Sequence, residues 1–278
     1  MKYDFLLYFP VQIALFLLLC TACSNDNEPV EPPVEAEYIQ RLKSIEYPGS
    51  TINSEKLLVT LEYDDLNRLI KMVEGYAEEV ITTLTYNNTE VTVERMGSYY
   101  GKYTLNEQGH ADSFERKSPP AYVYTYSADG YLIEAGSRND EEKQGYTYFS
   151  NSFSSCTVPG NEYTFTASTV KDPQNTPSLY QPRYLHIPGN AEVTIGYLAG
   201  LYGKPCEYLM ESANLIINKD LDWESKQVIT YAYEFNEEGL VAKQTESGEY
   251  YQKRNGTFRF KNSWNNDILF TYESVRIN

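Results

Sequence analysis

Residue types that commonly perform acid–base or metal chemistry are scarce in this sequence of 278 residues. Histidine is the usual general base and a frequent metal ligand, and it occurs only at His110 and His186. His110 follows a turn-forming glycine and His186 lies in a proline-rich connection, so we expect both to be structural or exposed to solvent. The metalloprotease pattern HExxH and the hydrolase pattern GxSxG do not occur. We therefore predict no catalytic residue, no metal site and no cofactor.

Carboxylates are the abundant reactive group, with 39 Asp and Glu residues. Glycoside hydrolysis uses two carboxyl groups that lie about 5–10 Å apart on either side of a sugar bond. Spacing along the sequence selects no such pair. A carboxylate-dependent envelope hydrolase that acts on glycan is therefore the alternative function, and not the leading one.

Aromatic side chains offer a second chemistry, the stacking of rings against the faces of sugars. The sequence contains 27 Tyr and 2 Trp. Tyr also packs well across neighbouring strands, because it joins a large apolar ring to a polar tip. The candidates for ligand stacking are Tyr99, Tyr100, Trp223, Tyr250, Tyr251 and Trp264.

Four cysteines occur, and two of them, Cys20 and Cys23, belong to the N-terminal segment. The other two, Cys156 and Cys206, could form a disulfide in an oxidising envelope. They could equally be two buried thiols, and their separation in sequence does not decide between these alternatives.

The N-terminal segment has the pattern of a lipoprotein signal. Lys2 precedes an apolar run from Leu6 to Leu19, which is too short for a transmembrane helix but suits a signal peptide. The small residues before Cys23 fit a lipobox, although Cys20 stands where leucine is usual. The alternative is a secretory signal without lipidation. We predict a lipoprotein signal peptide over residues 1–22, lipidation of Cys23, and a flexible, acidic, Pro-rich tether over residues 23–37.

Location and charge restrict the partners. The lipid anchor makes the membrane a partner and predicts an outer membrane lipoprotein, on the cell surface or the periplasmic face. The acidic segment behind Cys23 is similar to that of surface-displayed lipoproteins of Bacteroidetes-type bacteria. The net charge of −16 repels phosphate backbones, so we expect no nucleic-acid partner.

A hairpin pattern recurs in four nine-residue segments, 61–69, 103–111, 124–132 and 233–241. Apolar residues occupy the first, third and ninth positions of each segment. The short polar residue at the fourth position can open a type I turn, and Gly or Asn at the seventh tolerates positive φ. The fourth residues are Asp64, Asn106, Ser127 and Asn236, and the seventh are Asn67, Gly109, Gly130 and Gly239.

A fifth hairpin is expected around Asn87-Asn88, with Leu84 paired with Val91. Units that begin at residues 61, 84, 103 and 124 start 23, 19 and 21 residues apart. A period of about 21 residues fits two strands with their turns. We therefore predict an all-β fold over residues 38–278 as a single domain, an antiparallel meander of hairpin repeats that forms a barrel-like or strongly curved sheet. One short helix is expected near residues 195–211.

The expected outer face of this sheet carries Glu90, Lys102 and Glu234. A barrel that crosses a membrane needs a continuous apolar band facing lipid. We therefore expect a soluble sheet that does not span the membrane.

Two resemblances follow from these motifs. The segment Tyr63-Asp64-Asp65-Leu66-Asn67-Arg68-Leu69 resembles the YD repeat of Rhs-type shell proteins, with Asn67 in place of the usual Gly. The lipobox, the hairpins and the segment 195–205 together resemble an uncharacterised family of Bacteroidetes lipoproteins whose domain is described as porin-like. This resemblance implies a fold and no activity.

The leading expectation is a lipid-anchored, non-catalytic binding or structural module with a glycan or another envelope protein as its partner. Its basis is the combination of an anchor, a tether and a repetitive scaffold with few catalytic residue types. A scaffold component of a larger assembly is the remaining alternative.

Overall fold

The computed structural model describes residues 38–48, 56–75, 79–117, 121–138, 143–149, 151–172, 190–221 and 223–276. The expected signal peptide, Cys23, the tether and His186 lie outside the described residues. Within the described part of the chain there are sixteen strands and one helix, which confirms the all-β class.

Eight strands form the first half of the sheet. They are β1 (Tyr38–Tyr47), β2 (Leu57–Tyr63), β3 (Leu69–Gly75), β4 (Glu79–Tyr86), β5 (Glu90–Arg95), β6 (Ser98–Leu105), β7 (Ala111–Arg116) and β8 (Tyr122–Tyr126). The second half consists of β9 (Leu132–Ser137), β10 (Gln144–Phe149), β11 (Ser152–Val158), β12 (Asn161–Lys171), β13 (Tyr208–Ile217), β14 (Ser225–Phe235), β15 (Val241–Arg254) and β16 (Thr257–Arg276). The helix α2 (Asn190–Leu198) lies between β12 and β13 in the chain.

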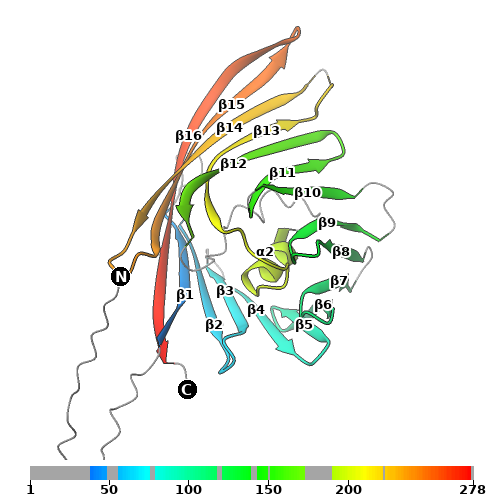
Figure 1. Ribbon diagram of the computed structural model, residues 1–278, viewed down its shortest axis with the longest axis vertical. Coiled ribbons are helices and arrows are strands. Elements are labelled where there is room, and N and C mark those ends of the chain that lie inside the picture. The colour runs from blue at the N-terminus through cyan, green and yellow to red at the C-terminus, as the bar shows by residue number, and fades with distance from the viewer. Residues whose placement is uncertain are drawn as a thin grey trace, which may run out of the picture. The chain divides into compact units, whose positions relative to one another are not determined.

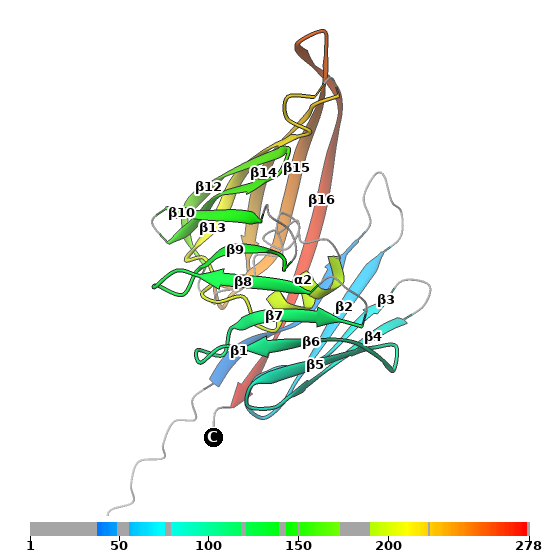
Figure 2. The ribbon, with the colours of Figure 1, turned by 90° about the vertical axis from the view of Figure 1, so that its right-hand side faces the viewer.

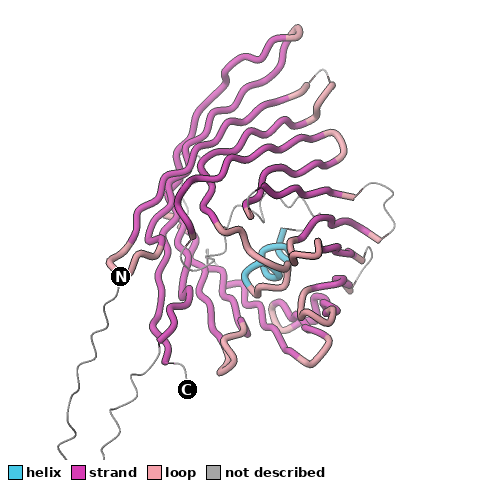
Figure 3. The backbone as a smooth tube through the Cα atoms, in the orientation of Figure 1, coloured by secondary structure: helices cyan, strands magenta, loops and turns pink. Residues whose placement is uncertain are grey.

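The strands follow one another around a closed barrel in sequence order, each antiparallel to its neighbours (Figures 1 and 3). The ring closes where β1 pairs with β16, from Tyr38↔Arg276 to Glu46↔Leu269. Closure leaves no edge strand with unpaired backbone groups. The expected meander of hairpins is thus confirmed as a barrel.

Up-and-down topology separates the connections into two rims. The turn rim includes the tight turns 64–68, 87–89, 106–110, 127–130 and 236–240. Tyr38 and Arg276, the first residue of β1 and the last of β16, also lie there. Among the connections with described residues, the far rim includes the turns 96–97, 159–160 and 255–256 and the loop between β13 and β14. A repeat of two strands returns the chain to the same end of the barrel, so every copy of the hairpin motif lies on the turn rim.

The predicted turn chemistry is confirmed. The Asn106 side-chain oxygen accepts hydrogen bonds from the backbone N–H groups of Gln108 and His110, each 3.0 Å long. Equivalent bonds are accepted by Asp64, Ser127 and Asn236. The seventh residues Asn67, Gly109, Gly130 and Gly239 have φ values of 60°, 80°, 87° and 80°.

The fifth hairpin has a different register from the expected one. Leu84 pairs with Val93 and not with Val91, because the Asn87 side chain accepts bonds from the backbone N–H groups of Thr89 and Glu90 and widens the loop. A slip of two residues keeps every side chain on its expected face. Leu84 therefore remains buried.

Alternating side chains give the barrel an apolar interior and a polar exterior. Val91 and Val93 on β5 are fully buried. Glu90, on the outer face of the same strand, forms an ion pair with Lys102 of β6 at 2.5 Å. The helix α2 lies within the ring of strands (Figures 1 and 2) and adds Ile195 to the same core.

The helix occurs, but it begins and ends earlier than the expected range near residues 195–211. Gly200 adopts a φ of 70° directly after it. The N–H of Gly200 donates to the carbonyl of Tyr197, and that of Leu201 to the carbonyl of Gly196, at 2.9 and 2.8 Å. This pair of bonds ends a helix. The rest of the expected range belongs to the connection and to β13.

The described residues include no helix that is long and apolar enough to cross a membrane.

Candidate functional site

An open groove of about 800 Å³ lies at the far rim, between the loop 218–224 and the tip of the β15–β16 hairpin. Its lining residues are Asp220, Leu221, Lys253, Arg254, Asn255, Gly256 and Arg259. The strands β15 and β16 are 14 and 20 residues long, and their hairpin extends beyond its neighbours in both views (Figures 1 and 2).

A two-residue turn forms the tip of this hairpin. Asn255 and Gly256 have φ values of 51° and 75°, which is the conformation that Asn-Gly favours between paired strands. The turn pairs Arg254 with Thr257 and, two residues further, Gln252 with Arg259. Residues two apart on one strand share a face, so Arg254 and Arg259 project from the same face of the hairpin.

The opposite wall of the groove is held to the hairpin by Glu224. Its Oε2 accepts hydrogen bonds from the Asp220 backbone N–H at 3.0 Å and from Lys253 Nζ at 2.7 Å. The backbone N–H of Lys253 donates to the Glu224 carbonyl at 2.9 Å. The bond from Lys253 lowers the pKa of the Glu224 carboxyl. The Lys253 charge is therefore balanced by Glu224.

The two arginines differ from Lys253 in having no counter-ion. Both are exposed, and within the described ranges neither forms an ion pair. The described lining of the groove therefore has two guanidinium groups without an ion pair, and Asp220 is the one carboxylate in it. Asp222, another acidic residue in the sequence of this loop, lies outside the described residues.

Of the six expected aromatic residues, the structure places one in the loop that forms a wall of the groove. Trp223 is 60% exposed there, next to Leu221, which is 46% exposed. Tyr251 pairs with Phe260 on the face of the hairpin opposite the arginines, where its hydroxyl donates to Glu249 at 2.5 Å. Tyr250 shares the face of Gln227 and Asn262 and is half-buried.

The remaining expected aromatics lie away from the groove. Trp264 packs against the core, and its Nε1 donates to Glu246 in the interior at 3.2 Å. Tyr99 is exposed and Tyr100 half-buried on β6, a distant strand of the barrel. The structure thus does not bring the six together as one stacking platform.

Sequence reasoning did not identify Arg254 and Arg259 as candidates. Their signal was present, because residues 253–261 contain four basic and no acidic residues in a chain of net charge −16. What the sequence did not show is that an Asn-Gly turn places two of these residues on one face opposite the loop 218–224.

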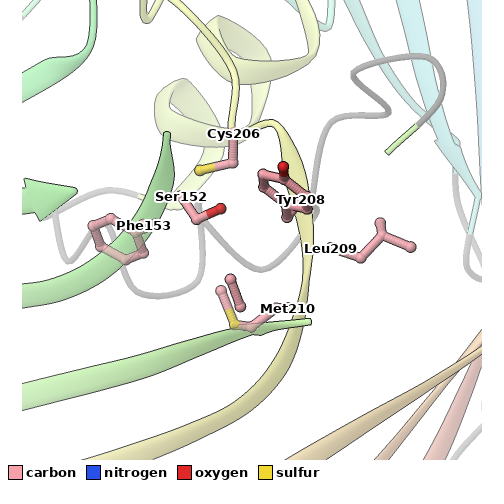
Figure 4. Close-up of a pocket in the computed structure, with 7 residues that line it drawn as sticks. Ser152, Phe153, Cys206, Tyr208, Leu209 and Met210 are labelled. Atoms are coloured by element: carbon pink, nitrogen blue, oxygen red, sulfur yellow. The ribbon is translucent and has the colours of Figure 1, made fainter. Parts of the chain in front are cut away.

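Cys156 and Cys206 carry thiols and do not form a disulfide with each other. Burial raises the pKa of the Cys156 thiol to about 12. Cys206 lines a cavity of about 10 Å³ with Ser152 and Phe153 of β11 and with residues of β13 (Figure 4). Such a volume holds about one water molecule, so this cavity is no ligand site.

Among the described residues, no group of three or more His, Cys, Asp or Glu side chains is placed to hold a metal ion.

Comparison with known proteins places the chain in a family. Residues 52–243 match the family described as "Domain of unknown function (DUF4595) with porin-like fold". The chain belongs to this family. The DUF4595 match ends before Arg254 and Arg259, so it gives no information about the groove's arginines.

A crystal structure of a porin-like protein from Bacteroides uniformis ATCC 8492 has a similar fold to this DUF4595 protein. The two chains are 17% identical, with a TM-score of 0.63 over 84% of this chain and 98% of the other. No curated protein matches the chain. The expected porin-like family and fold are thereby confirmed.

Proposed function

We propose that this DUF4595 protein is a lipid-anchored, non-catalytic binding module of the bacterial envelope, in which the barrel is a rigid scaffold and the far-rim groove binds a glycan. The porin-like fold supports an association with the envelope or outer membrane. The lipid anchor at Cys23 and the location, cell surface or periplasmic face, remain parts of the proposal.

The distribution of charge over the barrel is the observation that carries the scaffold role. Lysine–glutamate pairs join neighbouring strands on the outside at 2.5 to 3.0 Å: Lys71–Glu62, Lys102–Glu90, Lys143–Glu134 and Lys243–Glu234. A lysine on the lipid face of a barrel costs about 2–4 kcal/mol at the centre of the bilayer. A barrel with this exterior is more stable in water than in lipid.

The interior supports the same conclusion. Large side chains such as Tyr103, Phe114 and Tyr122 are fully buried on the inner face, and α2 adds Ile195 and Leu198 to that core. A barrel that is filled in this way is a packed core and not a channel.

The hydrolase alternative receives less support from the carboxyl groups. Hydrogen bonds from Lys102, Lys171 and Lys253 lower the pKa of Glu90, Glu207 and Glu224. A catalytic acid needs a raised pKa, so these three residues are held in the ionised form and do not suit that role. The resemblance of residues 63–69 to a YD repeat is likewise explained here by turn formation, and a shell-like role remains the less favoured alternative.

Two measurements on the full-length chain test the proposal. We expect Cys23→Ser to lose incorporation of a labelled fatty acid and to leave the membrane fraction, whereas Cys20→Ser retains both. We also expect the detergent-solubilised protein to bind members of a glycan array without releasing reducing ends. Lipidation of Cys23→Ser, or hydrolysis of any arrayed glycan, would contradict the proposal.

A further inference from the structure

We infer that the far-rim groove selects acidic polysaccharides, with Arg254 and Arg259 binding the carboxylates of the sugar units. This inference rests on the proposed glycan-binding function and specifies its ligand class. It begins from the contrast in charge between the tip of the hairpin and the rest of the molecule.

The hairpin tip is a basic region on an acidic protein. Residues 253–261 contain Lys253, Arg254, Arg259 and Lys261 and no Asp or Glu. A net charge of −16 otherwise repels anionic polymers. Local positive charge at the most extended part of the barrel therefore provides a place where such a polymer can approach.

The backbone pairing fixes the two arginines as neighbours. Arg254 lies opposite Thr257 and Arg259 lies opposite Gln252, so the arginines are diagonal partners on one face. Diagonal partners in an antiparallel pair are about 7–8 Å apart. Two like charges at that distance repel each other, and a bound anion between or along them relieves the repulsion.

The charge balance over the described lining residues is positive. Glu224 neutralises Lys253 through the 2.7 Å ion pair. Asp220 offsets one of the arginines, which leaves one positive charge in excess over the described lining residues. Guanidinium groups bind carboxylates through two parallel hydrogen bonds, so a carboxylate fits this excess charge.

The loop wall supplies the contacts that distinguish a sugar from a simple anion. Trp223 and Leu221 expose apolar surface beside the groove, and Asn255 is one of its lining residues. An indole ring packs against the apolar face of a sugar, and a side-chain amide can exchange hydrogen bonds with hydroxyl groups.

A polysaccharide suits the position of the groove better than a lipid surface does. The groove lies at the far rim, whereas the barrel's first and last described residues, Tyr38 and Arg276, lie at the turn rim. The arginines therefore lie at the end of the barrel opposite the one where the described chain begins and ends, a position open to a soluble polymer.

The test compares two ligands and two variants of the full-length chain in detergent. Polygalacturonate carries a carboxylate on each sugar, and its methyl-esterified form has the same backbone without the charges. The test variant is Arg254→Gln/Arg259→Gln. The matched control is Lys43→Gln/Arg276→Gln, which removes the same charge from two exposed residues outside the groove, one in the middle of β1 and one at the turn rim.

We expect the wild type to bind polygalacturonate more tightly than its ester, with affinity that falls as salt is raised. The arginine variant should bind polygalacturonate about tenfold more weakly or worse, because each charged hydrogen bond contributes more than a neutral one. The control should bind like the wild type, and Trp223→Ala should weaken binding to both forms.

Three results would overturn the inference. Equal binding of both forms by all variants would reject the acidic ligand while leaving glycan binding intact. Arginine-dependent binding to phosphatidylglycerol vesicles without binding to polygalacturonate would assign the groove to a membrane. Failure to bind any glycan on an array would reject the proposed function together with this inference.

Discussion

Glycine positions around the inner helix show how strongly single residues are fixed by their contacts. A Cβ atom on Gly196 would lie 2.7 Å from the ring of Tyr202 and 2.9 Å from the hydroxyl of Tyr103. A Cβ on Gly203 would lie 2.4 Å from the carbonyl oxygen of Gly130. These glycines allow the segment after α2 to pack against the hairpin turn at Gly130, where the Lys204 N–H donates to the same carbonyl.

Gly203→Ala should destabilise the protein more than Gly200→Ala. Both glycines have positive φ, 79° and 70°, so each substitution incurs a backbone cost of about 1–2 kcal/mol. Only the Gly203 variant adds a clash with backbone, which costs about 1–3 kcal/mol more, since a Cβ on Gly200 meets open space. Urea unfolding would measure the difference, and equal losses would show that the segment moves freely.

At the scale of the element, the hairpin repeat is stabilised by side chains that bond to their own turn. Asn106 accepts two backbone hydrogen bonds and its carbonyl accepts a third from Gly109 at 2.9 Å. Because all of these bonds lie within five residues, the turn forms in the same way at every copy of the motif. The repeat therefore builds one continuous rim.

Asn106→Ala should lower the free energy of unfolding by about 1 kcal/mol, because two backbone donors lose their acceptor. Gln108→Ala is the matched control, since Gln108 is exposed in the same turn and its side chain makes no hydrogen bond in the described structure. Thermal and urea unfolding of both variants would test this. A loss in the control as large as in Asn106→Ala would show that the side-chain bonds are not the cause.

At the scale of the whole molecule, buried tyrosines link stability to alkaline pH. Burial raises the pKa of both Tyr63 and Tyr163 to about 12. Burial raises that of Tyr103, Tyr124 and Tyr202 well above the ordinary value. In each case the folded protein retains a proton that the unfolded chain releases near pH 10.

The sign of the effect follows from this difference in bound protons. The stability from neutral buried tyrosines is fully present below pH 10 and is lost as the pH rises from 10 through 12. We expect tyrosinate absorbance and the loss of β circular dichroism to appear together in one cooperative transition. Gradual ionisation near pH 10 without unfolding would show that these hydroxyls are accessible to solvent.

The sequence by itself determined the features that depend on a few consecutive residues. Asn67 and Gly109 take positive φ and Asn106 closes its turn as the motif predicts, because these interactions are complete within the hairpin. The all-β class and the sequential order of strands follow from the same local signals. Lipidation of Cys23 remains a prediction from such a signal.

Tertiary structure alone decided the features that join distant residues. Closure pairs Tyr38 with Arg276, and it depends on the registers of all sixteen strands together. The bounds of α2 and the groove between residues 220 and 259 likewise depend on packing across the barrel. The sequence contains few catalytic residue types and did not locate a candidate site. The fold located one by placing Arg254 and Arg259 on one face of a hairpin.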